Sequence, residues 1–187
     1  MTRISLLRHG ATTAVGRYCG STNVPLTEEG WRQMWTAVAG RAWDRILCSP
    51  LERCAAFSAA LARRLAIPVT EDTRLREMHF GDWEGRSPHE IMACGPDALQ
   101  RFWADPIEAR PPRGESLSDV ASRVLAAWHE MLDGESDERV LVVTHGGPIR
   151  ILLLKLSGRP QAELLHLDVS HAALFDVSSP ENIAYAQ

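Results

Sequence analysis

The chain has 187 residues, of which 45% are hydrophobic, and a formal net charge of -4 at pH 7. This length is enough for one domain with a real core, and we expect residues 1–187 to fold as a single domain. The mildly acidic balance excludes a strongly basic protein that binds nucleic acid or an anionic membrane surface. A phosphate site would therefore have to be a local cluster of cations.

The cysteines and the N-terminal residues show no pattern typical of export or of a structural metal site. The four cysteines have no C-x-x-C spacing, and no charged N-terminal region precedes a long apolar segment. The longest apolar run, residues 149–156, is interrupted by Arg150 and Lys155 and is too short to span a bilayer. We expect a cytoplasmic protein with reduced cysteines and without a metal or other cofactor.

Short apolar runs alternate with longer amphipathic stretches along most of the chain. The runs predict strands at residues 4–7, 44–48, 68–70, 139–144 and 172–177, the last of them at one edge of the sheet. The stretches predict helices at residues 28–38, 50–66, 117–132 and 148–156. Thr27 is expected to cap the first helix, and Ser116 with Asp119 the third. This alternation indicates an α/β fold.

Residues 87–113 depart from the alternation, with two short helical segments and a Pro-rich exit. An excursion of this kind is typical of a lid or a specificity region. Residues 75–85, just before it, place two glycines among aromatic and acidic side chains, which predicts an ordered loop rather than a regular element.

Two of the predicted strands end in a histidine followed by a glycine. Arg8-His9-Gly10 follows the first strand, Thr144-His145-Gly146 ends the fourth, and Arg53 follows the second. Taken alone, this stretch fits two interpretations equally well: an anion site, or an arginine that pairs with a carboxylate beside a hydrogen-bonded core histidine. If the three strands are parallel and adjacent, two histidines and two arginines meet at one rim, where α/β sheets bind ligands. Arginine forks match phosphate oxygens, and Gly146-Gly147, just before the helix predicted from residue 148, adds backbone donors.

These residues are suited to phosphoryl transfer. A neutral imidazole among cations keeps its lone pair free to attack phosphorus, because the cations disfavour its protonation. An alkoxide leaving group needs an acid, which a nearby carboxyl can supply. Guanidinium groups already neutralise the developing charge, and arginines beside the histidines argue against a metal ion. We therefore expect no metal.

The whole pattern resembles the histidine phosphatase superfamily, also called the phosphoglycerate mutase-like family. The resemblance rests on the following blocks in this order: Arg8-His9-Gly10, Pro25-Leu26-Thr27 with Gly30, Ser49-Pro50-Leu51-Glu52-Arg53, Glu77 with Phe80-Gly81-Asp82-Trp83-Glu84-Gly85, Gly114-Glu115-Ser116, and Thr144-His145-Gly146. It implies a three-layer αβα sandwich with a mostly parallel central sheet and a phosphohistidine mechanism. By position, His9 would be the nucleophile and Glu77 the proton donor, while Arg8, Arg53 and His145 would form the phosphate pocket. Glu84, between Trp83 and Gly85, is expected to hold the loop instead.

Within that family, the segments 17–20 and 78–84 are similar to the α-ribazole phosphatases, which remove a 5'-phosphate late in building the nucleotide loop of cobalamin. Tyr18 and Gly20 are the candidate specificity residues in the first segment. Phe102 and Trp103 can stack a nucleobase-like ring, although we expect one of the two to belong to the core. The chain also departs from the family, because Val15 stands where many members carry a phosphate-contacting Asn. Thr12 or Thr13 is then the substitute donor.

Other functions fit the same residues. A broad-specificity small-molecule phosphatase or a phosphoglycerate mutase would use the same histidines, although a mutase usually needs longer insertions. A phosphate-binding regulatory module is the non-enzymatic alternative, and Glu77 argues against it because such a module has no use for a carboxyl beside a phosphate. We expect a small phosphate monoester as the partner, with no nucleic acid and no membrane. The sequence does not indicate an oligomeric state.

Overall fold

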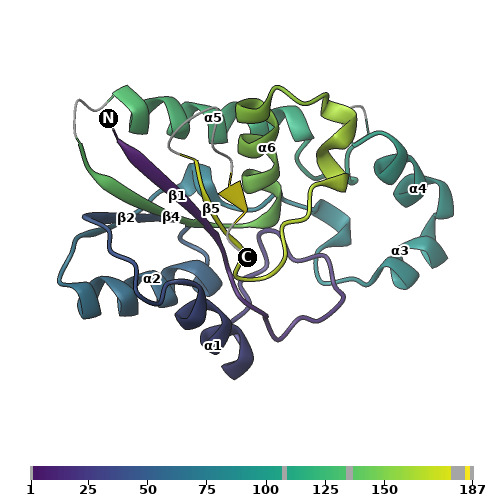
Figure 1. Cartoon of the computed structure of the whole chain (residues 1–187). Helices are drawn as coiled ribbons and strands as arrows, with labels where there is room; N and C mark the ends of the chain where they lie inside the picture. Colours follow the sequence, from purple (N-terminus) through teal and green to yellow (C-terminus); the bar gives the residue numbers. More distant parts are fainter. Residues whose placement is uncertain (1, 107–108, 134–136, 178–183, 186–187) are drawn as a thin grey trace.

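A mostly parallel β-sheet forms the middle layer of the protein in the computed structural model (Figure 1). The structure describes residues 2–106, 109–133, 137–177 and 184–185. Within them the sheet has six strands in the order β3-β2-β4-β1-β5-β6. The bounds are β1 (Arg3–Arg8), β2 (Arg45–Cys48), β3 (Val69–Glu71), β4 (Arg139–Thr144), β5 (Leu174–Asp176) and β6 (Ala184–Tyr185). The first four pair in parallel, whereas β5 and β6 are antiparallel additions.

Helices cover both faces of this sheet, and this confirms the predicted α/β sandwich of three layers. Helices α1 (Glu28–Ala37) and α2 (Glu52–Leu65) lie on one side, and α5 (Leu117–Asp133) and α6 (Gly146–Ser157) on the other (Figure 1). Side chains along a strand point alternately to the two faces. Accordingly, Val140 and Val142 pack in the core under α5 and α6, while Leu141 and Val143 pack in the core under α1 and α2.

The helix ends follow the capping residues predicted from the sequence. The Thr27 side chain accepts a hydrogen bond from the Gly30 amide and so begins α1. Ser116 and Asp119 exchange hydrogen bonds of 2.9 and 3.1 Å at the start of α5. Helix α6 begins two residues earlier than predicted, at Gly146 rather than Pro148. Its first turn therefore lies directly beside the end of β4.

The segment 87–113 contains the two predicted short helices, α3 (Pro88–Cys94) and α4 (Pro96–Ala104). They lie together at one end of the sandwich, at the right in Figure 1.

The prediction that the last strand closes the sheet edge is wrong. Strand β5 lies between β1 and β6, because the short β6 adds a further antiparallel partner.

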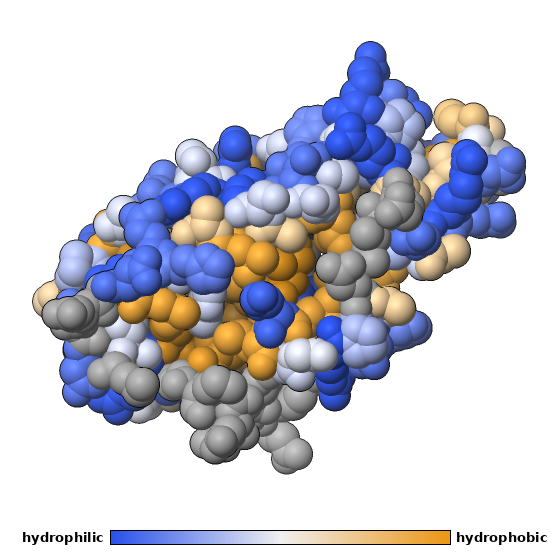
Figure 2. All heavy atoms as spheres, turned by 90° about the horizontal axis from the view of Figure 1, so that it is seen from above, coloured by the Kyte–Doolittle hydropathy of each residue, from blue (hydrophilic) through white to orange (hydrophobic). Residues whose placement is uncertain are grey.

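The outer face over α5 and α6 carries many hydrophobic side chains (Figure 2). A groove between α5, α6 and the 3₁₀ helix η3 (Gln161–His166) is lined mainly by apolar side chains, those of Leu117, Ala121, Leu125, Ile151, Leu154 and Leu164. Among the described residues, none of the helices has both the length and the apolar character that a membrane crossing requires. All four cysteines are free thiols.

Candidate active site

The three strands that were expected to be neighbours are adjacent and parallel, so their carboxyl ends meet. Strand β4 lies between β1 and β2, with Arg8 opposite Thr144 and Cys48 opposite Val143. The residues that follow these ends include His9 and His145, whose rings meet edge to face with centroids 5.2 Å apart. Arg53, on the first turn of α2, is only 1% exposed in the same place. The structure therefore brings together the predicted histidines and arginines.

His9 is held as a neutral imidazole with one nitrogen free. Its Nδ1 lies 2.8 Å from the carbonyl oxygen of Gly10, and because a carbonyl only accepts, Nδ1 carries the proton. Burial lowers the pKa of His9 to about 3, because the hydrogen bond to Gly10 only partly opposes burial and the charges of Arg53 and Arg8. At neutral pH the Nε2 lone pair is therefore available, as a nucleophile requires.

His145 is neutral as well, but both its ring nitrogens are engaged inside the protein. Its Nδ1 accepts a hydrogen bond of 3.1 Å from Arg53 Nε, so the proton resides on Nε2, which lies 2.8 Å from Ser49 Oγ. Burial, followed by the charge of Arg53, holds the pKa of His145 well below its usual value. His145 therefore fixes Arg53 and borders His9 with its ring edge.

The guanidinium of Arg53 faces main-chain carbonyls as well as His145. Its Nη1 donates to the Thr22 carbonyl at 2.9 Å, and Nη2 donates to the carbonyls of Gly20 and Cys19 at 2.7 and 3.1 Å. With the bond to His145, these contacts occupy four of the five N–H groups that an arginine has. In this structure Arg53 therefore keeps one Nη1 N–H for an incoming phosphate, and its role in phosphate binding stays a prediction.

Arg8 has the unsatisfied donor of the site. Its Nη1 donates to the Val169 carbonyl at 2.5 Å, but Nε is buried and has no hydrogen-bond partner among the described residues. Burial lowers the pKa of Arg8, although the nearby charge of Glu77 opposes the shift. Gly146, at the start of α6, lies beside this guanidinium. A buried N–H without a partner is costly, and an anion from outside would satisfy it.

The Glu77 carboxyl lies against the first turn of α6. Its oxygens accept hydrogen bonds from the Met78 amide at 2.9 Å and from the Gly147 amide at 3.2 Å. A Cβ at position 147 would lie 2.3 Å from Glu77 Oε1, so only glycine leaves room for the carboxyl. The Gly147 amide therefore binds Glu77 and is not open to an incoming anion.

The main chain around Glu77 is clamped by α5. Arg123 donates to the carbonyls of Arg74, Arg76 and Glu77 itself, at 2.7, 2.6 and 3.0 Å. Its remaining N–H groups form a two-pronged ion pair with Glu115, both at 2.9 Å, and Glu115 also accepts from the His79 amide at 2.8 Å. Arg123 and Glu115 thus position the loop that carries Glu77.

Comparison with known proteins agrees with this geometry. Residues 4–182 match the model of the histidine phosphatase superfamily (branch 1). The chain belongs to this superfamily.

Relatives that are named for different substrates resemble this chain to a similar degree. The adenosylcobalamin/alpha-ribazole phosphatase of Escherichia coli is 31% identical, over 89% of this chain and 85% of its own length. The glucosyl-3-phosphoglycerate phosphatase of Mycolicibacterium vanbaalenii is 38% identical, over 84% and 75%. The solved structure of YhfR from Bacillus stearothermophilus superposes with a TM-score of 0.87 at 31% identity, covering 94% of this chain and 90% of that one. The chain spans about half the length of the first curated relatives that it matches.

The loop carrying the superfamily block 80–85 is anchored by Glu84, as expected. Its carboxyl accepts hydrogen bonds from the main-chain amides of Phe80, Gly20, Ser21 and Thr22 at 2.9 to 3.1 Å. Burial raises the pKa of Glu84, but the hydrogen bond from the Thr22 hydroxyl and those from the amides outweigh burial and hold the pKa below its usual value. Gly20 packs so closely that a Cβ there would lie 1.8 Å from the Met78 carbonyl oxygen. In this structure, therefore, Gly20 holds two loops together.

A group of aromatic side chains connects the loops that carry Tyr18 and Phe80 to helix α4. Tyr18 packs against Phe80 with ring centroids 5.0 Å apart, and its hydroxyl accepts a hydrogen bond of 2.9 Å from Trp103 Nε1. Phe102 is 6% exposed and packs on Trp83, so it is the core member of the predicted pair, whereas Trp103 is 45% exposed. Trp103 therefore remains as the candidate stacking surface.

The substitutes proposed for the missing asparagine are held by their main chain. Thr12 pairs with Leu26 in an isolated bridge, and the Thr13 amide donates to the Pro25 carbonyl at 3.2 Å. Val15 is 85% exposed. A phosphate contact by Thr12 or Thr13 therefore stays a prediction.

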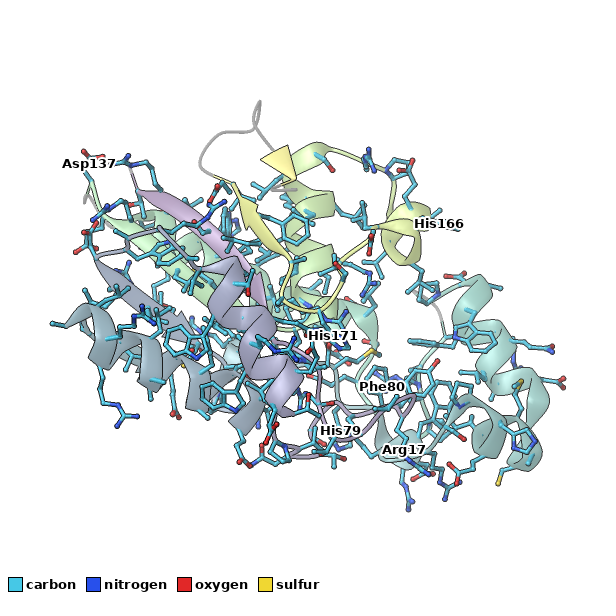
Figure 3. All side chains as sticks on the ribbon, turned by 60° about the horizontal axis from the view of Figure 1, so that its bottom comes forward. Arg17, His79, Phe80, Asp137, His166 and His171 are labelled. Atoms are coloured by element: carbon cyan, nitrogen blue, oxygen red, sulfur yellow. The ribbon has the colours of Figure 1, made fainter. Side chains whose placement is uncertain are left out.

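His171 is the residue that the sequence analysis missed. Its ring centroid lies 5.6 Å from that of His9, in the loop that precedes β5 (Figure 3). An antiparallel strand beside β1 begins at the end where β1 finishes, so the residues just before it lie at the same rim as His9. A polar residue just before the predicted strand 172–177 could therefore have been recognised as a candidate site residue. No cluster of His, Cys, Asp or Glu suited to a metal ion occurs within the described ranges.

Proposed function

We propose that the protein is a metal-independent phosphomonoesterase that works through a phosphohistidine on His9. The observation that carries the proposal is the state of His9: neutral, with Nδ1–H bound to Gly10 and with Nε2 free beside Arg8 and Arg53. The unpartnered Nε of Arg8 supplies a donor for a phosphate oxygen. A phosphate-binding module needs neither a free nucleophile nor a carboxyl beside it.

In the first step, His9 Nε2 attacks phosphorus, and the bond between phosphorus and the ester oxygen breaks. Glu77, protonated for this step, gives its proton to the departing alkoxide. In the second step, water attacks the phosphohistidine, and the Glu77 carboxylate takes a proton from that water. The phosphorus–nitrogen bond breaks, and inorganic phosphate and free His9 result. Arg8 and the remaining N–H of Arg53 stabilise charge on the phosphoryl oxygens throughout.

We propose α-ribazole 5'-phosphate as the substrate, in cobalamin nucleotide-loop synthesis in the cytoplasm. Support comes from the Escherichia coli relative and from the exposed Trp103, which a planar leaving group can stack on. The short helices α3 and α4, within segment 87–113, would shape that side as a lid or specificity region of a single domain. The alternative is a sugar phosphate, since the mycobacterial relative is a glucosyl-3-phosphoglycerate phosphatase and is more similar in sequence.

A substrate screen in the presence of a chelator tests this function. Wild type and His9→Ala are compared on p-nitrophenyl phosphate, α-ribazole 5'-phosphate, glucosyl-3-phosphoglycerate, nucleotides and 3-phosphoglycerate with a bisphosphate primer. We expect hydrolysis that resists the chelator and vanishes in His9→Ala, with the highest kcat/KM for α-ribazole 5'-phosphate. Hydrolysis that requires a metal would contradict the mechanism. A preference for glucosyl-3-phosphoglycerate would change the substrate, and transfer within 3-phosphoglycerate would indicate a mutase.

A further inference from the structure

The pocket around His9 has fewer free hydrogen-bond donors than its residues suggest. Both ring nitrogens of His145 are engaged, and Arg53 keeps one N–H. Val15 has an apolar side chain that is 85% exposed. Arg8 donates one Nη1 N–H to Val169, and its buried Nε has no hydrogen-bond partner among the described residues. A phosphoryl group has three oxygens that each accept strong hydrogen bonds, so it can take a further donor besides the N–H groups of the two arginines.

The loop of His171 is tied directly to the end of β1. The Ala172 amide donates to the His9 carbonyl at 3.1 Å, and the Arg8 amide donates to the Ala173 carbonyl at 3.0 Å. Arg8 Nη1 holds the Val169 carbonyl at 2.5 Å. Ala172 has a φ of 57°, in the left-handed region that non-glycine residues rarely adopt. Strained backbone of this kind persists where its surroundings impose it, frequently at functional sites.

The ring of His171 faces His9 and has no competing contact. The two centroids are 5.6 Å apart with a 44° tilt, and no hydrogen bond to the His171 ring occurs among the described residues. The side chain is exposed and borders a groove with Arg32 and Gln33 of α1, so a ligand can reach it from solvent. Figure 3 shows His171 near the middle of the molecule.

We propose that His171 is a substrate-binding residue that donates an imidazole N–H to an oxygen of the phosphoryl group held at His9. It would supply the donor that Val15 does not. The inference rests on the proposed function only in placing the phosphoryl group at His9. Partial burial, followed by the charge of Arg8, lowers the pKa of His171, and a phosphate dianion held at His9 would oppose that shift by neutralising Arg8.

Binding of inorganic phosphate and orthovanadate to the resting enzyme tests this role. In His171→Ala we expect each dissociation constant to rise about 10- to 100-fold, as for loss of one charge-assisted hydrogen bond. His171→Gln keeps an N–H donor and should recover part of this loss. His166→Ala removes an exposed imidazole on η3 and is the matched control, with wild-type binding expected. Unchanged vanadate affinity in His171→Ala would overturn the inference.

A spectroscopic readout separates ligand contact from a structural role. With ¹⁵N-labelled histidine, the imidazole signals of His171 should move when phosphate is added, and those of His166 should stay in place. Stationary His171 signals beside a moving His9 signal would contradict the proposal.

The proposed function and the role of His171 can fail independently. If phosphate binds through His171 but no phosphohistidine forms, the proposed function fails alone, whereas turnover through His9 with normal binding in His171→Ala overturns only this inference.

Discussion

The buried, neutral state of His9 makes the stability of the protein depend on pH. The folded protein keeps His9 unprotonated until its pKa of about 3, whereas the unfolded chain takes up the proton near the ordinary value of 6.5. Acid therefore favours the unfolded chain. The contribution of His9 to stability is fully present above pH 6.5 and is lost progressively as the pH falls toward 3.

The size of this effect follows from the pH range between the pKa of His9 in the unfolded chain and its pKa in the folded protein. Between pH 6.5 and pH 5 the unfolded chain is protonated and folded His9 is not, and each pH unit costs about 1.4 kcal/mol. Lowering the pH from 7 to 5 should therefore remove about 2 kcal/mol from the free energy of unfolding through His9 alone. Glutamine at position 9 is polar but does not titrate. We expect the loss between pH 7 and pH 5 to be about 2 kcal/mol smaller in His9→Gln than in wild type.

Urea unfolding at pH 7 and pH 5 in phosphate-free buffer measures this difference. The slopes against denaturant should agree between variants, so that the midpoints report stability. His166→Gln, which removes an exposed imidazole on η3, is the control and should lose as much stability as wild type. An equal loss in His9→Gln and wild type would refute the reasoning, because His9 would then not be the buried neutral group that the geometry indicates.

Three further outcomes test the groups around His9. Glu77→Gln should slow hydrolysis of alkyl phosphates by roughly 10²- to 10⁴-fold but hydrolysis of p-nitrophenyl phosphate much less, because that leaving group departs without a proton. Asp82→Asn should show no such dependence on the leaving group. If it does, Asp82 rather than Glu77 is the acid. Arg123→Met should show the same dependence on the leaving group in weaker form, because it releases the loop that carries Glu77. Arg110→Met, which removes an exposed ion pair, is the control and should not show it. Equal losses on both substrates in Arg123→Met would mean that Arg123 has a structural role only. Arg53→Lys should lower kcat/KM by about 10²-fold or more, because lysine cannot make the four contacts of the arginine, and a wild-type value would make Arg53 dispensable.

The layers of the fold were predictable because they depend on local patterns. Strand β4 is a β-branched, nearly unbroken apolar run, and Thr27 and Ser116 mark two helix starts. The place of the last strands was not predictable in the same way. Strand β6 is two residues long and exists through its pairing with β5, which no short pattern in the sequence encodes.

The residues of the site were predictable, but their orientation was not. The strand-end rule places His9, His145 and Arg53 at one rim. The direction of the Arg53 guanidinium depends on contacts with residues that are 92 and 33 positions away in the chain, His145 and Gly20. His171 joins the site through an antiparallel neighbour of β1, and an isolated histidine in a loop gives no signal of its own.

Trapping the reaction intermediate tests the central claim most directly. Wild-type enzyme mixed with a labelled phosphate ester and quenched in base within milliseconds should carry one phosphoryl group on a peptide that contains His9, and acid should release it. His9→Ala should carry none, and the label on His171→Ala should still lie on His9. Label that survives acid, or label on any peptide other than that of His9, would contradict the account.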